Sequence, residues 1–336
     1  MTADLTPAER EAAQLEYIDG RYEIISHFPF VAPRPILLAD HDDEAKRRCR
    51  FCARGKPEVR FRKKAHAVAH LLGNKSIISM NECDECNGHL GKYEDQLGKW
   101  TLFARALSHV PGKKNKLAKF KGGCGKLKIE HDAAGVTTLH LPSPRSPDAL
   151  LAGGFPAELP IAEDTESQPY IPIEAAKALV KIACSVCPPS ELGQCATAID
   201  WLMGRRQIGL KPFPVWFAFT PGPISNEVSD VVLLRRKQDS PEPYLWCVVQ
   251  CGNLRFQVFV PFCPADRALI RNDDTGCTFK ASGVHCPSKF GPDWPFGPTR
   301  YGYMDWSGEE PVRSAQTAAI CIQRVIAVHR PGQKLD

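Results

Sequence analysis

The 336-residue chain is predicted to have an α+β fold, in which a small zinc-stapled module precedes a mixed α+β C-terminal domain. Two Cys-x2-Cys pairs before residue 90 predict the module. A run with helical apolar spacing near residue 175 and four strand-like apolar runs between 215 and 260 predict the second domain. The composition agrees, because 43% of the residues are hydrophobic and 24% are charged, as in ordinary globular proteins.

Changes in composition divide the chain into four segments. The first is polar and contains a short predicted helix over Pro7–Tyr17. A stretch rich in Pro, Ser, Ala and Gly is the best candidate for a linker. The predicted segments are an N-terminal extension (1–45), a zinc-bound module with a basic loop (46–140), a linker (141–165) and a C-terminal α+β domain (166–336).

The C-terminal domain begins with helical patterns and continues with β patterns. Apolar residues recur with a helical period from Ile173 to Cys184, and a second helix is expected to end near Met203. Gly252-Asn253 separates two strand-like runs and indicates a hairpin. The cluster Arg235–Lys237 is expected to be a solvated strand end, and the tail from Ala315 to Val328 is expected to be helical. The strand-like runs begin at Val215, Val231, Tyr244 and Leu254.

Four cysteines are expected to bind zinc. Each Cys-x2-Cys pair places two thiolates on one tight turn, which suits a tetrahedral Zn²⁺ ion. Charged and polar residues flank the pairs, so buried free thiols are the weaker alternative. The ion would staple a module that is too small to build a core of its own. The predicted ligands are Cys49, Cys52, Cys83 and Cys86.

The other cysteines indicate a reducing, cytoplasmic environment. Many of the fourteen cysteines lie in apolar runs, where a thiol behaves as a small hydrophobe, as Cys184 and Cys187 do. No apolar signal segment begins the sequence and no stretch reaches the roughly 18 apolar residues that cross a bilayer, so no membrane partner is expected. A weaker candidate for a second metal site comprises Cys277, His285 and Cys286.

Positive charge is concentrated in one part of the chain. The formal net charge is +5 overall, but residues 41–130 hold 21 Lys and Arg against 10 Asp and Glu, a net charge of +11. A field of this sign attracts phosphate groups, so a nucleic-acid partner is expected. The candidate nucleic-acid-binding residues are Arg60, Arg62, Lys63, Lys64, Lys113, Lys114 and Lys116.

The residues around the second cysteine pair carry a resemblance to a known family. A basic segment leads into Ala65-His-Ala-Val-Ala-His-Leu-Leu-Gly-Asn74, and Asn81-Glu-Cys-Asp-Glu-Cys-Asn87 opens a predicted helix. Over about residues 46–100 the chain resembles the HNH endonuclease superfamily in its four-cysteine, ββα-metal form. The resemblance implies a metal-dependent endonuclease that hydrolyses DNA phosphodiesters, with RNA left open as a substrate.

The resemblance also implies a role for each catalytic residue. His66, at the end of the first strand, would be the general base, because a neutral imidazole is available near pH 7. Asn87, in the first turn of the helix, would present its side-chain oxygen to a catalytic Mg²⁺ or Mn²⁺ ion. Related modules are joined to regulatory or targeting domains in bacterial antiphage systems. The C-terminal domain is therefore expected to govern the nuclease through a ligand or protein partner, in a regulated defence effector.

One departure from the family's pattern keeps two alternatives open. Ala65 stands where many such sites have an aspartate that is a second metal ligand. The first alternative is a zinc-stabilised nucleic-acid-binding protein without catalysis, and the second is a module that organises a protein complex. Glu94 with Asp95 is interpreted as a helix-stabilising or salt-bridging pair in preference to a metal ligand. The carboxylates near the site are Glu82, Asp84, Glu94 and Asp95.

Overall fold

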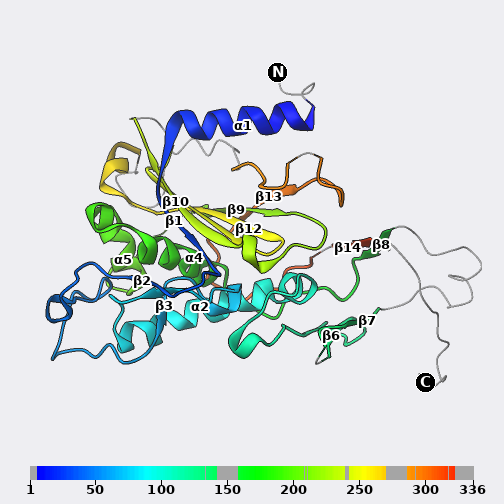
Figure 1. Cartoon of the computed structure of the whole chain (residues 1–336), viewed down its shortest axis with the longest axis horizontal. Coiled ribbons are helices and arrows are strands. Elements are labelled where there is room, and N and C mark those ends of the chain that lie inside the picture. Colours follow the sequence, from blue (N-terminus) through cyan, green and yellow to red (C-terminus); the bar gives the residue numbers. More distant parts are fainter. Residues whose placement is uncertain are drawn as a thin grey trace, which may run out of the picture.

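The mixed α+β class predicted from the sequence is confirmed by the computed structural model shown in Figure 1. The structure describes residues 6–132, 134–141, 158–207, 209, 211–238, 242–269, 286–291, 293–316 and 318–321. The helices within these ranges are α1 (Pro7–Arg21), α2 (Asp84–Leu107), α4 (Pro172–Val186) and α5 (Ala196–Leu202).

A six-stranded antiparallel sheet forms the centre of the molecule. The predicted hairpin is confirmed: the strand that ends at Cys251 pairs with the strand that begins at Leu254, and these two residues lie opposite each other. Gly252 makes that turn with a φ of 53°, a conformation that costs a glycine little. In sheet order the strands are β1 (Tyr22–Pro29), β10 (Asp230–Arg236), β11 (Leu245–Cys251), β12 (Leu254–Phe259), β9 (Pro214–Phe219) and β13 (Arg300–Asp305).

Helix α4 lies between this sheet and the cysteine-containing part of the chain. It packs against β11 and β12 on one side and against α2 on the other, as Figure 1 shows. Its C-terminal carbonyl groups would otherwise lack partners. Ser26 Oγ of β1 donates to the carbonyl of Val186 at 2.8 Å, and Arg50 Nη1 donates to three further carbonyls at 2.8–3.0 Å. The C-terminal end of α4 is therefore bound both by β1 and by the loop that carries Arg50.

The segment before α2 forms a small second sheet. Its strands are β2 (Ile36–Leu38), β4 (Ile77–Ser79) and β3 (Ala65–His66), with β2 parallel and β3 antiparallel to β4. Asn74 fixes the connection from β3 to β4, because its buried amide donates to the carbonyls of Val68 and Ile77. Since α2 follows β4 directly, β3, β4 and α2 form a ββα unit.

Shorter strands complete the described fold. A second hydrophobic cluster, which includes Phe103 and Phe120, lies between α2 and the β5–β6–β7 sheet. In that sheet the segments Lys128–His131 and Thr137–His140 pair antiparallel. The remaining strands are β5 (Phe120–Lys121), β6 (Lys128–His131), β7 (Thr137–His140), β8 (Glu158–Ile161) and β14 (Ala318–Cys321).

Two local expectations are wrong. The predicted C-terminal helix is contradicted over Ala318–Cys321, which form a strand paired with β8, and the rest of that run lies outside the described residues. Arg236 is not solvated: it is 6% exposed and its Nη1 lies 2.9 Å from Asp266 Oδ1. Arg235 binds Glu23 at 2.7 Å. Partners distant in sequence stabilise these cations, so their local spacing did not reveal them.

The predicted segments share one hydrophobic core. Phe51 and Leu90 of the cysteine-containing module belong to the same buried cluster as Leu179 and Val249 of the C-terminal part. The N-terminal extension also supplies β1 to the central sheet. The four-segment division stays a prediction about units of folding. Residues 142–157 of the predicted linker, and Cys277 and His285 of the weaker metal candidate, lie outside the described residues.

Candidate functional site

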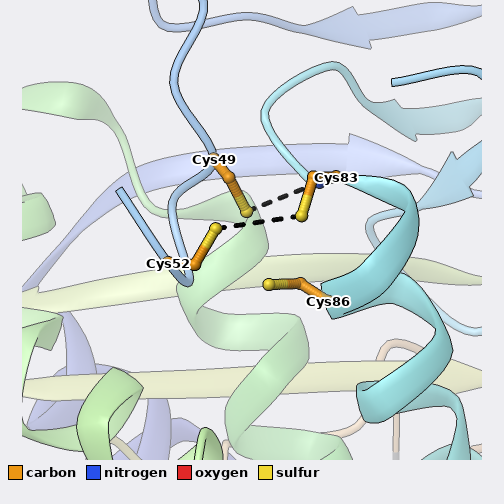
Figure 2. A group of neighbouring side chains, drawn as sticks. All are labelled: Cys49, Cys52, Cys83 and Cys86. Carbon is orange, nitrogen blue, oxygen red and sulfur yellow. Dashed lines mark hydrogen bonds between the residues drawn. The ribbon is translucent and has the colours of Figure 1, made fainter. Parts of the chain in front are cut away.

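The four predicted cysteine ligands converge on one point. Their Sγ atoms all lie within 4.8 Å of one another, and Figure 2 shows all four pointing into a common centre. Cys49 and Cys52 come from a loop, whereas Cys83 precedes α2 and Cys86 lies in its first turn. None of the four forms a disulfide. Four thiol groups at this spacing could hold a metal ion.

Backbone contacts fix the two halves of this cluster. The amide of Cys83 donates to Cys49 Sγ at 3.4 Å. The Asn81 side chain donates to the carbonyl of Arg48 at 2.8 Å, which ties the loop to the segment before α2. A hydrogen bond from Cys86, with help from backbone amides, outweighs burial and lowers the pKa of Cys49.

Asp84 attaches the basic segment to the start of α2. Its Oδ1 accepts hydrogen bonds from the backbone amides of Arg62 at 2.9 Å and Lys63 at 2.8 Å. Its own amide donates to the carbonyl of Arg60 at 2.9 Å. The side chains of these basic residues and of Lys64 are exposed. These hydrogen bonds attach the exposed basic segment to the start of α2, next to the cysteine cluster.

His66 occupies the end of β3, as the sequence predicts. It pairs with Ile78 of β4, and its ring is half-buried. Its Nδ1 is buried, and no described residue forms a hydrogen bond with it. Burial, followed by the charges of His70, Lys64 and Lys181, lowers the pKa of His66 to about 4. The imidazole is consequently neutral at physiological pH and can accept a proton.

His70 lies beside His66, which the sequence analysis did not anticipate. The two ring centroids are 5.0 Å apart and the planes are perpendicular. The Nδ1 atom of His70 is also buried, and no described residue forms a hydrogen bond with it. Burial lowers the pKa of His70, and the charges of Lys75, Lys64 and Lys113 lower it further. The charge of Lys113 thus contributes to the lowered pKa of His70.

A buried lysine of α4 supports the strand that carries His66. The side chain of Lys181 is 1% exposed, and its Nζ donates to the backbone carbonyl of His66 at 2.7 Å. The same Nζ lies 3.1 Å from Glu94 Oε1 and 3.4 Å from Glu82 Oε2. Burial acts to lower the pKa of Lys181, but the two carboxylates outweigh it and raise the pKa. A charged ammonium therefore holds β3, α2 and α4 together.

Most of the nearby carboxylates already have partners. Burial raises the pKa of Glu82 to about 7, although Lys181 opposes this effect. Glu94 forms the ion pair with Lys181, so its interpretation as a salt-bridging residue is confirmed. Among the described residues, the cysteine cluster is the one group of three or more His, Cys, Asp or Glu side chains whose ligand atoms converge. A preformed acidic site for a second cation is not part of the described structure.

Asn87 lies in the first turn of α2 and is half-buried, as the sequence predicts. Its backbone amide donates to the carbonyl of Cys83 at 2.9 Å, the regular hydrogen bond of a first helical turn. Its side chain offers one amide oxygen, an atom that hard cations accept as a ligand. His89, two residues on, contacts the carbonyl of Leu202 at 3.1 Å and belongs to the helix packing.

The predicted nucleic-acid-binding cations are all exposed. Lys113 and Lys114 lie in a 3-10 turn (Lys113–Asn115), and Lys116 follows it. Within the described part of the chain, none of the seven predicted cations forms an ion pair with a carboxylate. Unpaired surface cations of this kind remain available to phosphate groups. The seven residues are Arg60, Arg62, Lys63, Lys64, Lys113, Lys114 and Lys116.

No family model, curated protein or solved structure matches the chain. Of the helices that the structure describes, none combines the length and apolar character needed to span a bilayer.

Proposed function

We propose that the cysteine cluster holds a structural Zn²⁺ ion. Zn–S bonds of about 2.3 Å in a tetrahedron would place sulfur atoms about 3.8 Å apart. The Sγ atoms of Cys52 and Cys83 lie 3.8 Å apart.

Cys83→Ser should therefore lower both the zinc content and the thermal unfolding temperature. Cys124→Ser is the matched control, because Cys124 is an exposed thiol outside the cluster. Parental zinc content and stability in Cys83→Ser would disprove the proposal.

We further propose that the protein is an HNH-type, metal-dependent endonuclease that hydrolyses DNA phosphodiesters. The observation that supports this most is the neutral, half-buried imidazole of His66 at the end of β3, with a pKa of about 4. The ββα unit that carries it also carries Asn87 and is anchored by the cysteine cluster. The exposed cations beside the unit supply the positive surface that a nucleic-acid backbone requires.

In the proposed reaction, the His66 imidazole accepts a proton from a water molecule. The water oxygen forms a bond to phosphorus while the bond to the leaving sugar oxygen breaks, and that oxygen is then protonated from solvent. The low pKa makes His66 a weaker base than an ordinary histidine, but it is unprotonated over the whole neutral range. When bound, Mg²⁺ or Mn²⁺ would stabilise the negative charge of the transition state. The side-chain oxygen of Asn87 would be a ligand for that ion.

A plasmid-nicking assay in Mg²⁺ or Mn²⁺ tests the proposal. The parent should convert supercoiled DNA to nicked or linear DNA, and His66→Ala should reduce the rate at least a hundredfold. His41→Ala is the matched control, since His41 is an exposed histidine outside the site. A labelled RNA substrate, run in parallel, distinguishes the two nucleic acids. Full activity in His66→Ala would remove the proposed base.

The second candidate function is nucleic-acid binding without catalysis. It is favoured by one observation: Glu82 and Glu94, two carboxylates that could complete a cation site, both lie within ion-pair distance of the ammonium of Lys181. This candidate predicts that DNA binds at low salt but stays intact with every divalent metal. Metal-dependent cutting that disappears in His66→Ala would rule it out.

We propose a regulatory or targeting role for residues 166–336 in antiphage defence. The support is that α4 contacts the central sheet and, through Lys181, the carbonyl of His66. A partner that shifts the sheet could thus alter the strand that carries His66. The test compares phage plating on cells that express the parent or His66→Ala. Equal plating on both strains, at equal protein levels, would argue against a defence role that depends on cutting.

A further inference from the structure

Arg105 of α2 is a buried cation that no carboxylate balances within the part of the chain that the structure describes. The residue is 8% exposed. Its guanidinium donates to Thr101 Oγ1 at 3.0 Å, to the carbonyl of Gly98 at 2.9 Å and to the carbonyl of Leu71 at 3.4 Å. All three acceptors are neutral, and they use three of the five N–H donors. A buried charge without a counter-charge is costly, so an external anion is the natural partner.

An open cavity gives such an anion access to Arg105. Residues of α2 line it, among them Arg105 and the two cations Lys92 and Lys99, which are about two turns apart. Asp95 and Glu174 also line the cavity. Lys92 and Asp95 are both exposed and within one turn of each other, so they can screen each other in solvent. Lys92, Lys99 and Arg105 outnumber Asp95 and Glu174 by one, so the lining has a net charge of +1.

We propose that this cavity is a phosphate subsite for the backbone of the nucleic-acid substrate. The inference rests on the proposed function. A guanidinium fork matches two phosphate oxygens, and its remaining donors suit that pairing. Leu71, which lines the cavity and accepts a hydrogen bond from Arg105 through its carbonyl, directly follows His70 in the chain. The described lining holds no aromatic ring for stacking a base, which favours the sugar–phosphate backbone over a free nucleotide.

The salt dependence of DNA binding tests this subsite. All proteins carry His66→Ala, so that the oligonucleotide is not cut. Each phosphate contact contributes about 0.9 to the slope of log K against log salt concentration for duplex DNA. Arg105→Gln should therefore reduce the slope by about one unit and weaken binding equally for different sequences. If Arg105→Gln does not fold, the double variant Lys92→Gln/Lys99→Gln decides, with an expected reduction of about one unit.

The control is Lys211→Gln/Arg300→Gln, which removes two exposed cations from residues outside the cavity and should keep the parental slope. Parental slopes in Arg105→Gln, or in the double variant if that protein does not fold, would overturn the subsite. Inorganic phosphate that binds through Arg105, with an unchanged oligonucleotide slope, would overturn it in favour of a small-anion site. Absence of DNA binding by the His66→Ala protein at low salt would instead refute the proposed function itself.

Discussion

Replacing Lys181 with methionine should cause a large loss of stability. The side chain of Lys181 is 1% exposed, and methionine keeps most of its volume while removing the charge and the three donors. Glu82 and Glu94 would then lose their counter-charge, and the carbonyl of His66 would lose the 2.7 Å hydrogen bond. The two carboxylates would remain buried or half-buried without compensation.

The size of the effect follows from the contacts. At 3.1 and 3.4 Å from the two carboxylates, and with an effective dielectric constant of about 20, each gross attraction is about 5 kcal/mol. Desolvation of the three groups offsets much of this in the folded protein. Removing the lysine alone leaves that desolvation uncompensated, which typically costs about 3–5 kcal/mol. Because the total stability of a domain is about 5–15 kcal/mol, Lys181→Met should be near the limit of folding.

Urea unfolding at pH 7.5 measures the difference. Lys177→Met is the matched control, because Lys177 lies one turn earlier on α4 and contacts the rings of Tyr93 and Trp201. No ion pair with a carboxylate is described for it, so its loss should be about 1 kcal/mol. The double variant Lys181→Met/Glu94→Gln should recover part of the deficit. Equal losses in the two methionine variants would refute the argument that the carboxylates make Lys181 essential.

Three further predictions concern the proposed zinc ion, the protonation of His66 and the loop that carries Lys113, Lys114 and Lys116. Removing zinc with a chelator should lower the unfolding temperature by well over 5 °C, and added Zn²⁺ should restore it; an unchanged unfolding curve would contradict a structural ion. The pKa of His66 is about 4 in the folded protein and 6.5 by reference, so the unfolded chain binds more protons between these values. Stability should therefore fall as the pH decreases from about 6.5 to 4, with a smaller slope in His66→Gln but not in His41→Gln; identical slopes in all three proteins would refute the assigned burial. Changing Lys113, Lys114 and Lys116 to Ala should reduce the salt slope of DNA binding by up to about 3 units without altering sequence preference, and a parental slope would exclude the loop from the interface.

Local patterns predicted the elements that depend on neighbours in sequence. The helical period from Ile173 found α4, and the Gly252-Asn253 turn found the β11–β12 hairpin. His66 and Asn87 also lie where the sequence placed them, at a strand end and in a first helical turn. Each of these features rests on side-chain periodicity or on a turn residue, which a short window of sequence displays.

Long-range partners were beyond such patterns. β1 looked like part of an extension because its strand partner, β10, lies some two hundred residues away. The end of the chain has a helical period, yet Ala318–Cys321 pair with β8. Arg236 looked like a surface charge because Asp266 is distant in sequence. In each case a contact formed only on folding overrides the local preference.

The sequence by itself determined which four cysteines could bind a metal ion and which part of the chain is positively charged, because thiol spacing, residue type and net charge are properties of the chain. From the sequence we predicted only that the four cysteines lie together and that His66 lies at the end of a strand. Tertiary structure alone decided what surrounds them. Folding placed His70 against His66 and put Lys181 between Glu82 and Glu94. Protonation and charge depend on burial and on neighbours from other elements, and these exist only once the helices and sheets have packed.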